Sequence, residues 1–207
     1  MNKKFRIGIA GNIGVGKTTL TKKLSSDLKC YPIYESVIDN PYLPDFYNNM
    51  SRWSFNLQIY FLYTRFEGQI KLLKMNKNFI QDRTIYEDKE IFATNLYELG
   101  HMSKRDYQTY CELFNSMIQF VKQPDLIIYL KANTDTLMSR IRQRNRSYEL
   151  EMSSEYIHSL NIYYDKWISK LETKQVLLIK TDDFDIYKDD EKYKIIKENI
   201  ENKLNGQ

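Results

Sequence analysis

A glycine-rich segment near the N-terminus has residues of the right type and spacing to bind phosphate. Gly11, Gly16, Lys17 and Thr18 fit the pattern Gly-x-x-x-x-Gly-Lys-[Ser/Thr]. In such a loop, backbone N–H groups point at a phosphate, the lysine reaches the β and γ phosphates, and the hydroxyl can ligate Mg²⁺. The pattern predicts a site for a nucleoside triphosphate and Mg²⁺. Its predicted residues are Gly11, Asn12, Ile13, Gly14, Val15, Gly16, Lys17, Thr18 and Thr19.

Charged residues follow two further apolar runs. Glu35 ends the run 30–35, and Asp82 and Arg83 lie at the end of the run 78–84. A carboxylate at this position can take a proton from an attacking hydroxyl, and an arginine can neutralise charge on a transferring phosphoryl group. A second carboxylate can help to hold a metal ion. We therefore predict that Glu35, Asp82 and Arg83 are catalytic, and that Thr18 and Asp82 hold Mg²⁺.

Four arginines alternate along a short segment, at positions 140, 142, 144 and 146. Arg140 and Arg144 are four residues apart and share one side of a helix, whereas Arg142 faces elsewhere. Planar guanidinium groups suit the spread charge of a phosphoryl group in transfer. We predict an arginine-rich lid over about 140–149, with Arg140 and Arg144 in ATP binding and catalysis. A nucleic-acid contact would need more aromatic neighbours than Tyr148, so no nucleic-acid partner is predicted.

Two helical segments carry side chains that suit a flat heterocycle. Gln58 and Arg65 are two turns apart in the helical pattern 51–75, and Asp88 and Phe92 share a face of the next helix. A pocket between these helices would offer donors, acceptors and an aromatic ring. Alternatively, Phe92 is a core aromatic and Arg65 is a solvated charge.

The remaining pattern predicts the elements that position these residues. Five apolar runs separated by helical segments indicate an α/β fold, in which a five-stranded parallel sheet is covered by helices on both faces. Such folds bind ligands at the carboxyl ends of their strands. The predicted strands are 5–10, 30–35, 78–84, 125–130 and 175–181. The predicted helices are 51–75, 86–99, 103–121, 134–145, 153–172 and a C-terminal helix with Tyr193, Ile196, Ile200 and Leu204 on its packing side.

Length and composition fit a single domain over 1–207. Apolar residues make up 42% of the 207 residues, and Pro and Gly are too scarce to mark a linker. Because the first predicted strand begins within a few residues of position 1, we expect no signal peptide, and no apolar run approaches the length of a membrane span. We expect a cytoplasmic protein without a membrane partner, in which Cys30 and Cys111 are reduced thiols. The net charge of +4 is compatible with an acidic substrate such as a nucleotide.

At the level of whole motifs, the sequence resembles the deoxynucleoside kinases, and within them the short bacterial-type deoxyadenosine/deoxyguanosine kinases. The resemblance implies a P-loop kinase fold. The matching blocks occur in the family's order: GNIGVGKTTL (11–20), YES (34–36), RWSFNLQIYFLYTR (52–65), QDRTIYEDKEIFA (81–93) and SRIRQRNRSYE (139–149).

The resemblance also implies roles at the reacting end of the site. Glu35 matches the base that deprotonates the nucleoside 5′-hydroxyl. Arg83 matches the arginine beside that hydroxyl and the γ-phosphate. Asp82 stands where relatives have Glu or Asp assisting the metal. Asp183 and Phe184 fall in the loop that lies near the adenine of ATP.

For the nucleoside itself, the resemblance assigns further residues. Tyr47 and Glu149 match the pair that holds the sugar 3′-hydroxyl. Gln58 matches the glutamine that hydrogen-bonds the base edge, and Phe92 the aromatic ring that stacks on the base. A pair such as Arg65 and Asp88 accompanies purines or cytosine in this family, whereas relatives that favour thymidine carry smaller apolar residues there.

The expected function is ATP-dependent phosphorylation of the 5′-hydroxyl of a deoxynucleoside, with deoxyadenosine favoured. The alternatives are a deoxycytidine or broad-specificity deoxynucleoside kinase, a nucleoside monophosphate kinase, and a non-catalytic ATP-binding module. A regulatory GTPase is excluded, because KANTDT (131–136) stands where Asn-Lys-x-Asp would be required. Relatives commonly pair through long helices, so a homodimer through the helices around 51–75 and 103–121 is expected.

Overall fold

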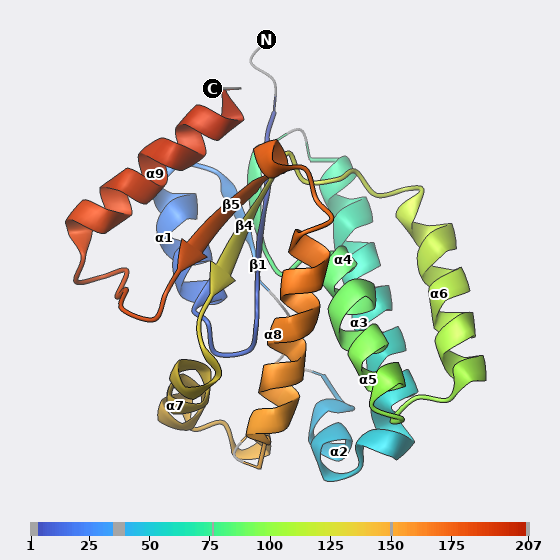
Figure 1. Ribbon diagram of the computed structural model, residues 1–207. Coiled ribbons are helices and arrows are strands. Elements are labelled where there is room, and N and C mark those ends of the chain that lie inside the picture. The colour runs from blue at the N-terminus through green and yellow to red at the C-terminus, as the bar shows by residue number, and fades with distance from the viewer. Residues whose placement is uncertain (1–3, 35–39, 76, 150, 206–207) are drawn as a thin grey trace.

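Five parallel strands form the centre of the fold (Figure 1). The computed structural model describes residues 4–34, 40–75, 77–149 and 151–205. The strands are β1 (Arg6–Gly11), β2 (Tyr31–Ile33), β3 (Phe79–Asp82), β4 (Leu126–Lys131) and β5 (Val176–Lys180), in the sheet order β2-β3-β1-β4-β5. Each strand falls on a predicted apolar run, although β1 and β4 end one residue beyond the predicted runs 5–10 and 125–130, and the prediction of a five-stranded parallel sheet is confirmed.

The burial of the central strand β1 explains why helices cover both faces of the sheet. Ile7 of β1 pairs with Ile80 of β3 on one side and with Leu126 of β4 on the other. Ile7 and Ile9 are fully buried, and so are most of their neighbours along the strand. Strands with such continuous apolar runs are stable only when helices cover both faces of the sheet.

The helical segments follow the predicted order. They are α1 (Lys17–Asp27), α2 (Leu43–Asn48), α3 (Met50–Leu73), α4 (Ile85–Glu87), the π-helical turn η1 (Asp88–Ala93), α5 (Thr94–Glu98), α6 (Lys104–Ile118), α7 (Thr134–Arg144), the 3₁₀ turn η2 (Ser147–Glu149), α8 (Ser154–Ile168), the 3₁₀ turn η3 (Thr173–Gln175) and α9 (Asp190–Leu204).

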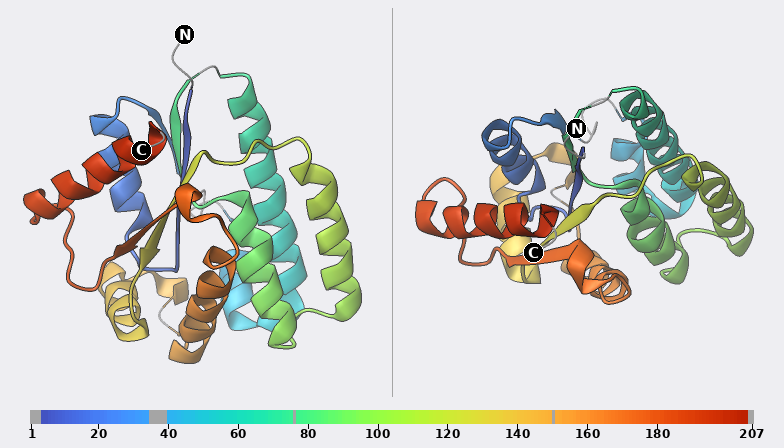
Figure 2. Two further views of the ribbon diagram at one scale, coloured as in Figure 1. Left: turned by 45° about the horizontal axis from the view of Figure 1, so that its top comes forward. Right: turned by 90° about the horizontal axis from the view of Figure 1, so that it is seen from above.

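The helices form a layer on each face of the sheet (Figures 1 and 2). α1 and α9 cover one face, while α8, α4 and α3 cover the other. α6 packs against α3 as the outermost helix. α2 and α7 lie at the bottom of Figure 1, the end to which the strand arrows point. The carboxyl ends of the strands therefore face these two short helices.

Polar caps fix where several helices begin. The Asn49 side chain accepts a hydrogen bond from the Arg52 N–H and starts α3, and the Ser103 hydroxyl accepts one from the Asp106 N–H and starts α6. These starts lie within one residue of the predicted ones. The short helix α2 was not predicted. The helix predicted over 86–99 is divided into α4, η1 and α5, because a π turn interrupts it.

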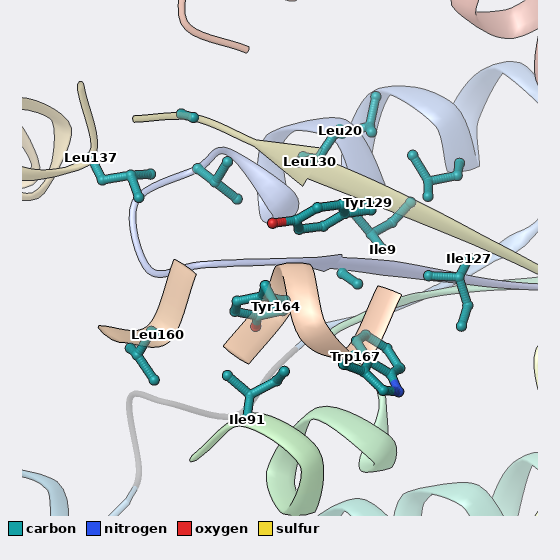
Figure 3. Close-up of a cluster of buried hydrophobic side chains, with 14 of the residues drawn as sticks. Ile9, Leu20, Ile91, Ile127, Tyr129, Leu130, Leu137, Leu160, Tyr164 and Trp167 are labelled. Carbon is teal, nitrogen blue, oxygen red and sulfur yellow. The ribbon is translucent and has the colours of Figure 1, made fainter. Parts of the chain in front are cut away.

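The core lies between the sheet and its helices (Figure 3). Figure 3 shows Leu20 of α1 on one side of the strands, and Tyr164 and Trp167 of α8 on the other. The packing side predicted for α9 is confirmed: Tyr193, Ile196 and Ile200 are buried, and Leu204 packs against the core. The Tyr193 hydroxyl also donates to Asp27 of α1 at 2.6 Å, which ties the two helices of this face together.

The two cysteines are free thiols, as predicted. Burial raises the pKa of the Cys30 thiol to about 11, so this thiol stays protonated near neutral pH. Within the ranges that the structure describes, no helix is both long and apolar enough to cross a membrane.

Gly8 of β1 gives a test of how tightly β1 packs. A Cβ at this position would lie 2.4 Å from Cγ2 of Thr84, so Gly8→Ala should lower the free energy of unfolding by about 1–3 kcal/mol. Gly68 of α3 has nothing within 4 Å of its Cβ position, so Gly68→Ala should raise stability by up to about 1 kcal/mol. Urea unfolding of both variants checks the pair. Equal effects would contradict the packing described for β1.

Candidate active site

The phosphate-loop residues form the turn between β1 and α1. Gly14 and Gly16 have φ values of 82° and 102°, in the region that favours glycine. A Cβ at Gly11 would lie 2.6 Å from the Leu130 carbonyl oxygen of β4, so the loop can leave β1 only with glycine there. The loop places the N-terminus of α1 toward a cavity of about 1030 Å³. This arrangement suits an anion.

Hydrogen bonds within the loop and between the loop and other elements hold it in place. Lys17 Nζ donates to the Asn12 carbonyl oxygen at 3.0 Å. The Asn12 side chain donates to the Ile157 carbonyl and to Asn161 Oδ1 at 2.9 and 2.8 Å, both on α8. The Gly11 N–H donates to the Glu87 carboxylate at 3.2 Å. Gly11 and Asn12 therefore fix the loop to its surroundings, while Ile13 to Thr19 line the cavity.

The end of β3 brings Asp82 and Arg83 to the loop. Thr18 Oγ1 donates to Asp82 Oδ2 at 2.5 Å. Arg83 has a φ of 65°, which is uncommon for a residue other than glycine and costs free energy that the surrounding structure must offset. Its backbone N–H donates to the Ile9 carbonyl, and its guanidinium carbon lies 4.4 Å from the centre of the Phe92 ring. The loop and Arg83 thus meet in one cavity.

The oxygen atoms of Thr18 and Asp82 suit Mg²⁺. Mg²⁺ prefers oxygen ligands, is commonly held through one or two carboxylates, and takes its other ligands from water and substrate phosphates. A hydroxyl and a carboxylate oxygen beside a phosphate loop match that donor set. Among the described residues, no group of three or more His, Cys, Asp or Glu side chains could hold a metal ion. Thr18 and Asp82 stay the predicted metal ligands.

Away from the phosphate loop, the side chains that line the cavity suit a flat heterocyclic ring. Gln58 and Phe61 of α3 line it from one side, and Asp88 and Phe92 of η1 from the other. Gln58 is 2% exposed, and its Oε1 atom has no hydrogen-bond partner among the described residues. Since a buried amide oxygen without a partner costs free energy, this atom marks a place for a ligand donor.

Arg65 lies behind this wall and outside the cavity lining. Its Nε donates to Asp88 Oδ2 at 2.6 Å, and its Nη1 donates to the Arg83 carbonyl oxygen at 3.3 Å. The side chains of Arg65 and Asp88 are 6% and 2% exposed, so the ion pair is buried. Arg65 is therefore neither a solvated charge nor a lining residue: it holds Asp88 in position.

The arginines of α7, together with Arg146 just after the helix, bind two different sets of partners. Arg140 donates to the Thr181 hydroxyl and carbonyl oxygens at 3.1 and 2.5 Å, beside the phosphate loop. Arg144 pairs with Glu149 at 2.5 Å, and Arg146 pairs with the same carboxylate at 3.4 Å. All three arginines line the cavity. Arg142 is exposed and lies outside the lining, as predicted.

Tyr47 lies near Glu149 and Arg144 in the lining of the cavity. Burial raises the pKa of the Tyr47 phenol well above its ordinary value of 10, and the nearby Tyr156 and Glu149 raise it further. Its ring stacks on Tyr148 with centroids 6.0 Å apart. The phenol is therefore a protonated donor beside a carboxylate acceptor, which suits a ligand hydroxyl.

The predicted residues fall into three groups. Most line one cavity, including Phe184 from the loop after β5. Four lie outside the lining: Gly11, Asn12, Arg65 and Asp183. Glu35 lies outside the described residues, although Tyr34 before it lines the cavity.

Sequence reasoning missed several contributors. Tyr156 and Tyr187 also line the cavity, and so does Arg146, which was predicted within the lid but without a role at the site. Asn145, the residue before Arg146, has a φ of 52° and ends α7 in the left-handed conformation, and an asparagine at the end of a helical pattern is a sequence signal for such a chain reversal. Glu87 was missed as well, although Thr84-x-x-Glu87 is a capping-box pattern.

Comparison with known proteins identifies the family. The sequence model of the deoxynucleoside kinase family matches residues 7–205. The chain is 42% identical over 190 residues to the deoxyadenosine/deoxycytidine kinase of Bacillus subtilis, covering 91% of this chain and 88% of that protein. It is 37% identical over 207 residues to a deoxyguanosine kinase of Lactobacillus acidophilus, covering 96% and 90%.

The fold leads to the same group of proteins. A structure of the M. mycoides deoxyadenosine kinase with the products dCMP and a flexible dCDP superimposes with a TM-score of 0.82 at 33% identity, covering 98% of this chain and 100% of that one. A structure of the same kinase with dATP gives a TM-score of 0.79 at 32% identity, covering 97% and 99%. The chain therefore belongs to the deoxynucleoside kinase family.

Proposed function

We propose that this protein transfers the γ-phosphoryl group of ATP to the 5′-hydroxyl of deoxyadenosine, giving the 5′-monophosphate. The observation that carries the proposal is the single cavity that joins the phosphate loop to the wall of Gln58 and Phe92. A triphosphate and a nucleoside can meet end to end in such a cavity. An ATP-binding module without an acceptor would not need the polar wall at the far end.

At the phosphate end, the chain binds and orients the donor. The loop N–H groups and Lys17 hold the β and γ phosphates, and Arg140 lies on the cavity wall beside them. Thr18 and Asp82 would hold Mg²⁺, which would supply positive charge to neutralise these phosphates. Arg83 offers its guanidinium to the phosphoryl group in transfer. Glu35 takes the proton of the attacking 5′-hydroxyl.

At the sugar, the proposal uses the donor and acceptor beside α7. The Tyr47 phenol donates to the 3′-hydroxyl and the Glu149 carboxylate accepts from it. Arg144 and Arg146 hold Glu149, which is only 3% exposed, so its charge is compensated before a ligand arrives. Arg144 also faces the cavity, where it can contact a phosphate.

At the base, the proposal uses Gln58, Asp88 and Phe92. The unpartnered Gln58 oxygen accepts from the amino group of adenine, and the Phe92 ring stacks on the base. Arg65 holds the Asp88 carboxylate toward the pocket, where it accepts from the base edge. Thymine would set its 4-oxo and 5-methyl groups against this pair, leaving polar groups badly matched.

Deoxycytidine is the second candidate for the same pocket. The amide of Gln58 can pair with cytosine after a flip, and cytosine also carries an exocyclic amino group. The relative from Bacillus subtilis is named for both nucleosides, and the M. mycoides deoxyadenosine kinase holds dCMP in one structure. These names favour adenine or cytosine over thymine.

Several expectations stay predictions. They are the single domain over 1–207, the lid over about 140–149, the cytoplasmic location, the homodimer and the lack of a nucleic-acid partner. The homodimer has some support in exposed apolar side chains, namely Tyr63 on α3, Leu113 on α6 and Phe120 just after α6.

The substrate preference can be tested with kcat/KM for four deoxynucleosides at saturating ATP. We expect deoxyadenosine to rank first, deoxycytidine or deoxyguanosine next, and thymidine at least about tenfold below the best substrate. Thymidine in first place would contradict the pocket described. Deoxycytidine in first place would keep the pocket and overturn the adenine assignment.

The buried ion pair of Arg65 and Asp88 gives a second test of the proposed base pocket. Asp88→Ala leaves the Arg65 charge buried without its carboxylate, so it should lower the free energy of unfolding by about 3–5 kcal/mol. Adding Arg65→Met should recover most of that loss and shift kcat/KM toward thymidine. Glu67→Ala breaks the exposed Lys71 pair and serves as the control, with an effect below about 1 kcal/mol. If the losses in unfolding free energy of the two single variants simply add in the double variant, the unpaired Arg65 charge is not the cause of the Asp88→Ala loss.

Glu35 can be tested by a substitution that keeps its shape. Glu35→Gln removes the base, so turnover should fall about a hundredfold or more, while ATP binding measured by titration stays close to that of the unchanged protein. Glu67→Gln, an exposed carboxylate on α3, is the matched control and should keep full turnover. Near-normal turnover in a folded Glu35→Gln protein would remove Glu35 from the mechanism.

A further inference from the structure

Glu87 is a fully buried carboxylate outside the cavity lining of the described residues. Its Oε2 accepts from the Thr84 N–H at 2.7 Å and from the Thr84 hydroxyl at 3.1 Å. Its Oε1 accepts from the Gly11 N–H at 3.2 Å and from the Tyr164 hydroxyl at 2.7 Å. Two of these donors form a helix cap, but Gly11 and Tyr164 lie 76 and 77 residues away along the chain. A local cap does not account for them.

Tyr164 extends this contact to Arg83. Its hydroxyl accepts from Arg83 Nη1 at 2.7 Å while it donates to Glu87. Arg83 Nη1 also lies 3.5 Å from Glu87 Oε1. Tyr164 is fully buried on α8, and its ring stacks on Tyr129 with centroids 5.7 Å apart (Figure 3). Burial and stacking therefore restrict the position of the ring that carries this hydroxyl.

The Glu87 carboxylate is thus linked to two parts of the phosphate site, the phosphate loop and Arg83. Through Gly11 it holds the first residue of the phosphate loop, and through Tyr164 it holds the guanidinium of Arg83. The long arginine side chain has several rotatable bonds, so fixed partners such as Tyr164 and Glu87 restrict where its guanidinium lies. In phosphoryl transfer, catalysis depends on donors that are already positioned where charge develops.

We propose that Glu87 and Tyr164 are positioning residues that fix the Arg83 guanidinium relative to the phosphate loop. The proposal rests on the proposed phosphoryl transfer, in which Arg83 contacts the moving group. Neither residue touches the substrate. Their loss should therefore lower the rate of transfer while leaving the binding of both substrates nearly unchanged.

Tyr164→Phe tests this with the loss of one oxygen atom. We expect kcat to fall about tenfold, while KM for ATP and for the nucleoside changes by less than about twofold. Glu87→Gln should have at least the same effect, because its amide NH₂ must oppose either the Thr84 N–H or the Gly11 N–H. The matched control is Tyr129→Phe. Its hydroxyl contacts Asp165 instead, so its kcat should be unchanged.

A double-mutant cycle separates positioning from a general structural role. In an Arg83→Ala background, the guanidinium that Tyr164 would position is gone, so Tyr164→Phe should lower kcat by less than about twofold there. A structural role would give the same tenfold loss in both backgrounds. That result, or an equal rise in both KM values, would overturn the proposal.

A measurement without substrate keeps this inference distinct from the proposed function. The side-chain Nε–H signal of Arg83 in a ¹⁵N spectrum can be assigned by its loss in Arg83→Ala. Tyr164→Phe and Glu87→Gln should shift or broaden that signal, and Tyr129→Phe should not. An unchanged signal would overturn the positioning role, whatever the activity. A changed signal in a protein that phosphorylates no deoxynucleoside would support the positioning role and refute the proposed function.

Discussion

All five strands run parallel, so every strand ends at the same edge of the sheet, and the residues that follow the strands must share that edge. The phosphate loop follows β1, Arg83 follows β3, and the chain after β5 returns Thr181 and Phe184 to the same cavity. This convergence depends on the near-continuous burial of β1 between β3 and β4. The sheet thus gathers side chains that are far apart in the sequence.

Gathering phosphate-binding groups in one cavity also concentrates positive charge. Lys17, Arg83, Arg140, Arg144 and Arg146 all line it. Like charges in a partly enclosed space repel one another, and the structure offsets this with buried carboxylates on the cavity wall and behind it. Those carboxylates are Asp82, Glu87, Asp88 and Glu149. Arg83 lies beside Glu87, and Arg144 and Arg146 pair with Glu149, so much of this positive charge has an acidic partner without any bound phosphate.

The sequence predicts the parts of this arrangement that depend on local pattern. Apolar runs predict the strands, and the spacing of glycines, Lys17 and Thr18 predicts the phosphate loop. Local pattern cannot predict which of two adjacent groups faces the ligand. Arg65 was expected in the pocket beside Asp88, yet it lies behind Asp88, because the partners of a buried charge are set by tertiary packing.

Local pattern also cannot predict the long-range contacts of Glu87. As the third residue after Thr84 it reads as a helix cap, and it does cap α4. Its contacts to Gly11 and Tyr164 arise only when β1, β3 and α8 are assembled. The π turn η1 was also missed, because the apolar spacing around Asp88 to Ala93 fits an ordinary helix.

The close approach of Gly8 to Thr84 links two positions that are remote in sequence. The Thr84 methyl group fills the space that a side chain on β1 would occupy, while the Thr84 hydroxyl is held by Glu87. Serine keeps that hydroxyl and lacks the methyl group. A lineage that carries serine at position 84 is thus free to accept alanine at position 8, so these two sites should evolve as a pair in which the change at 84 comes first.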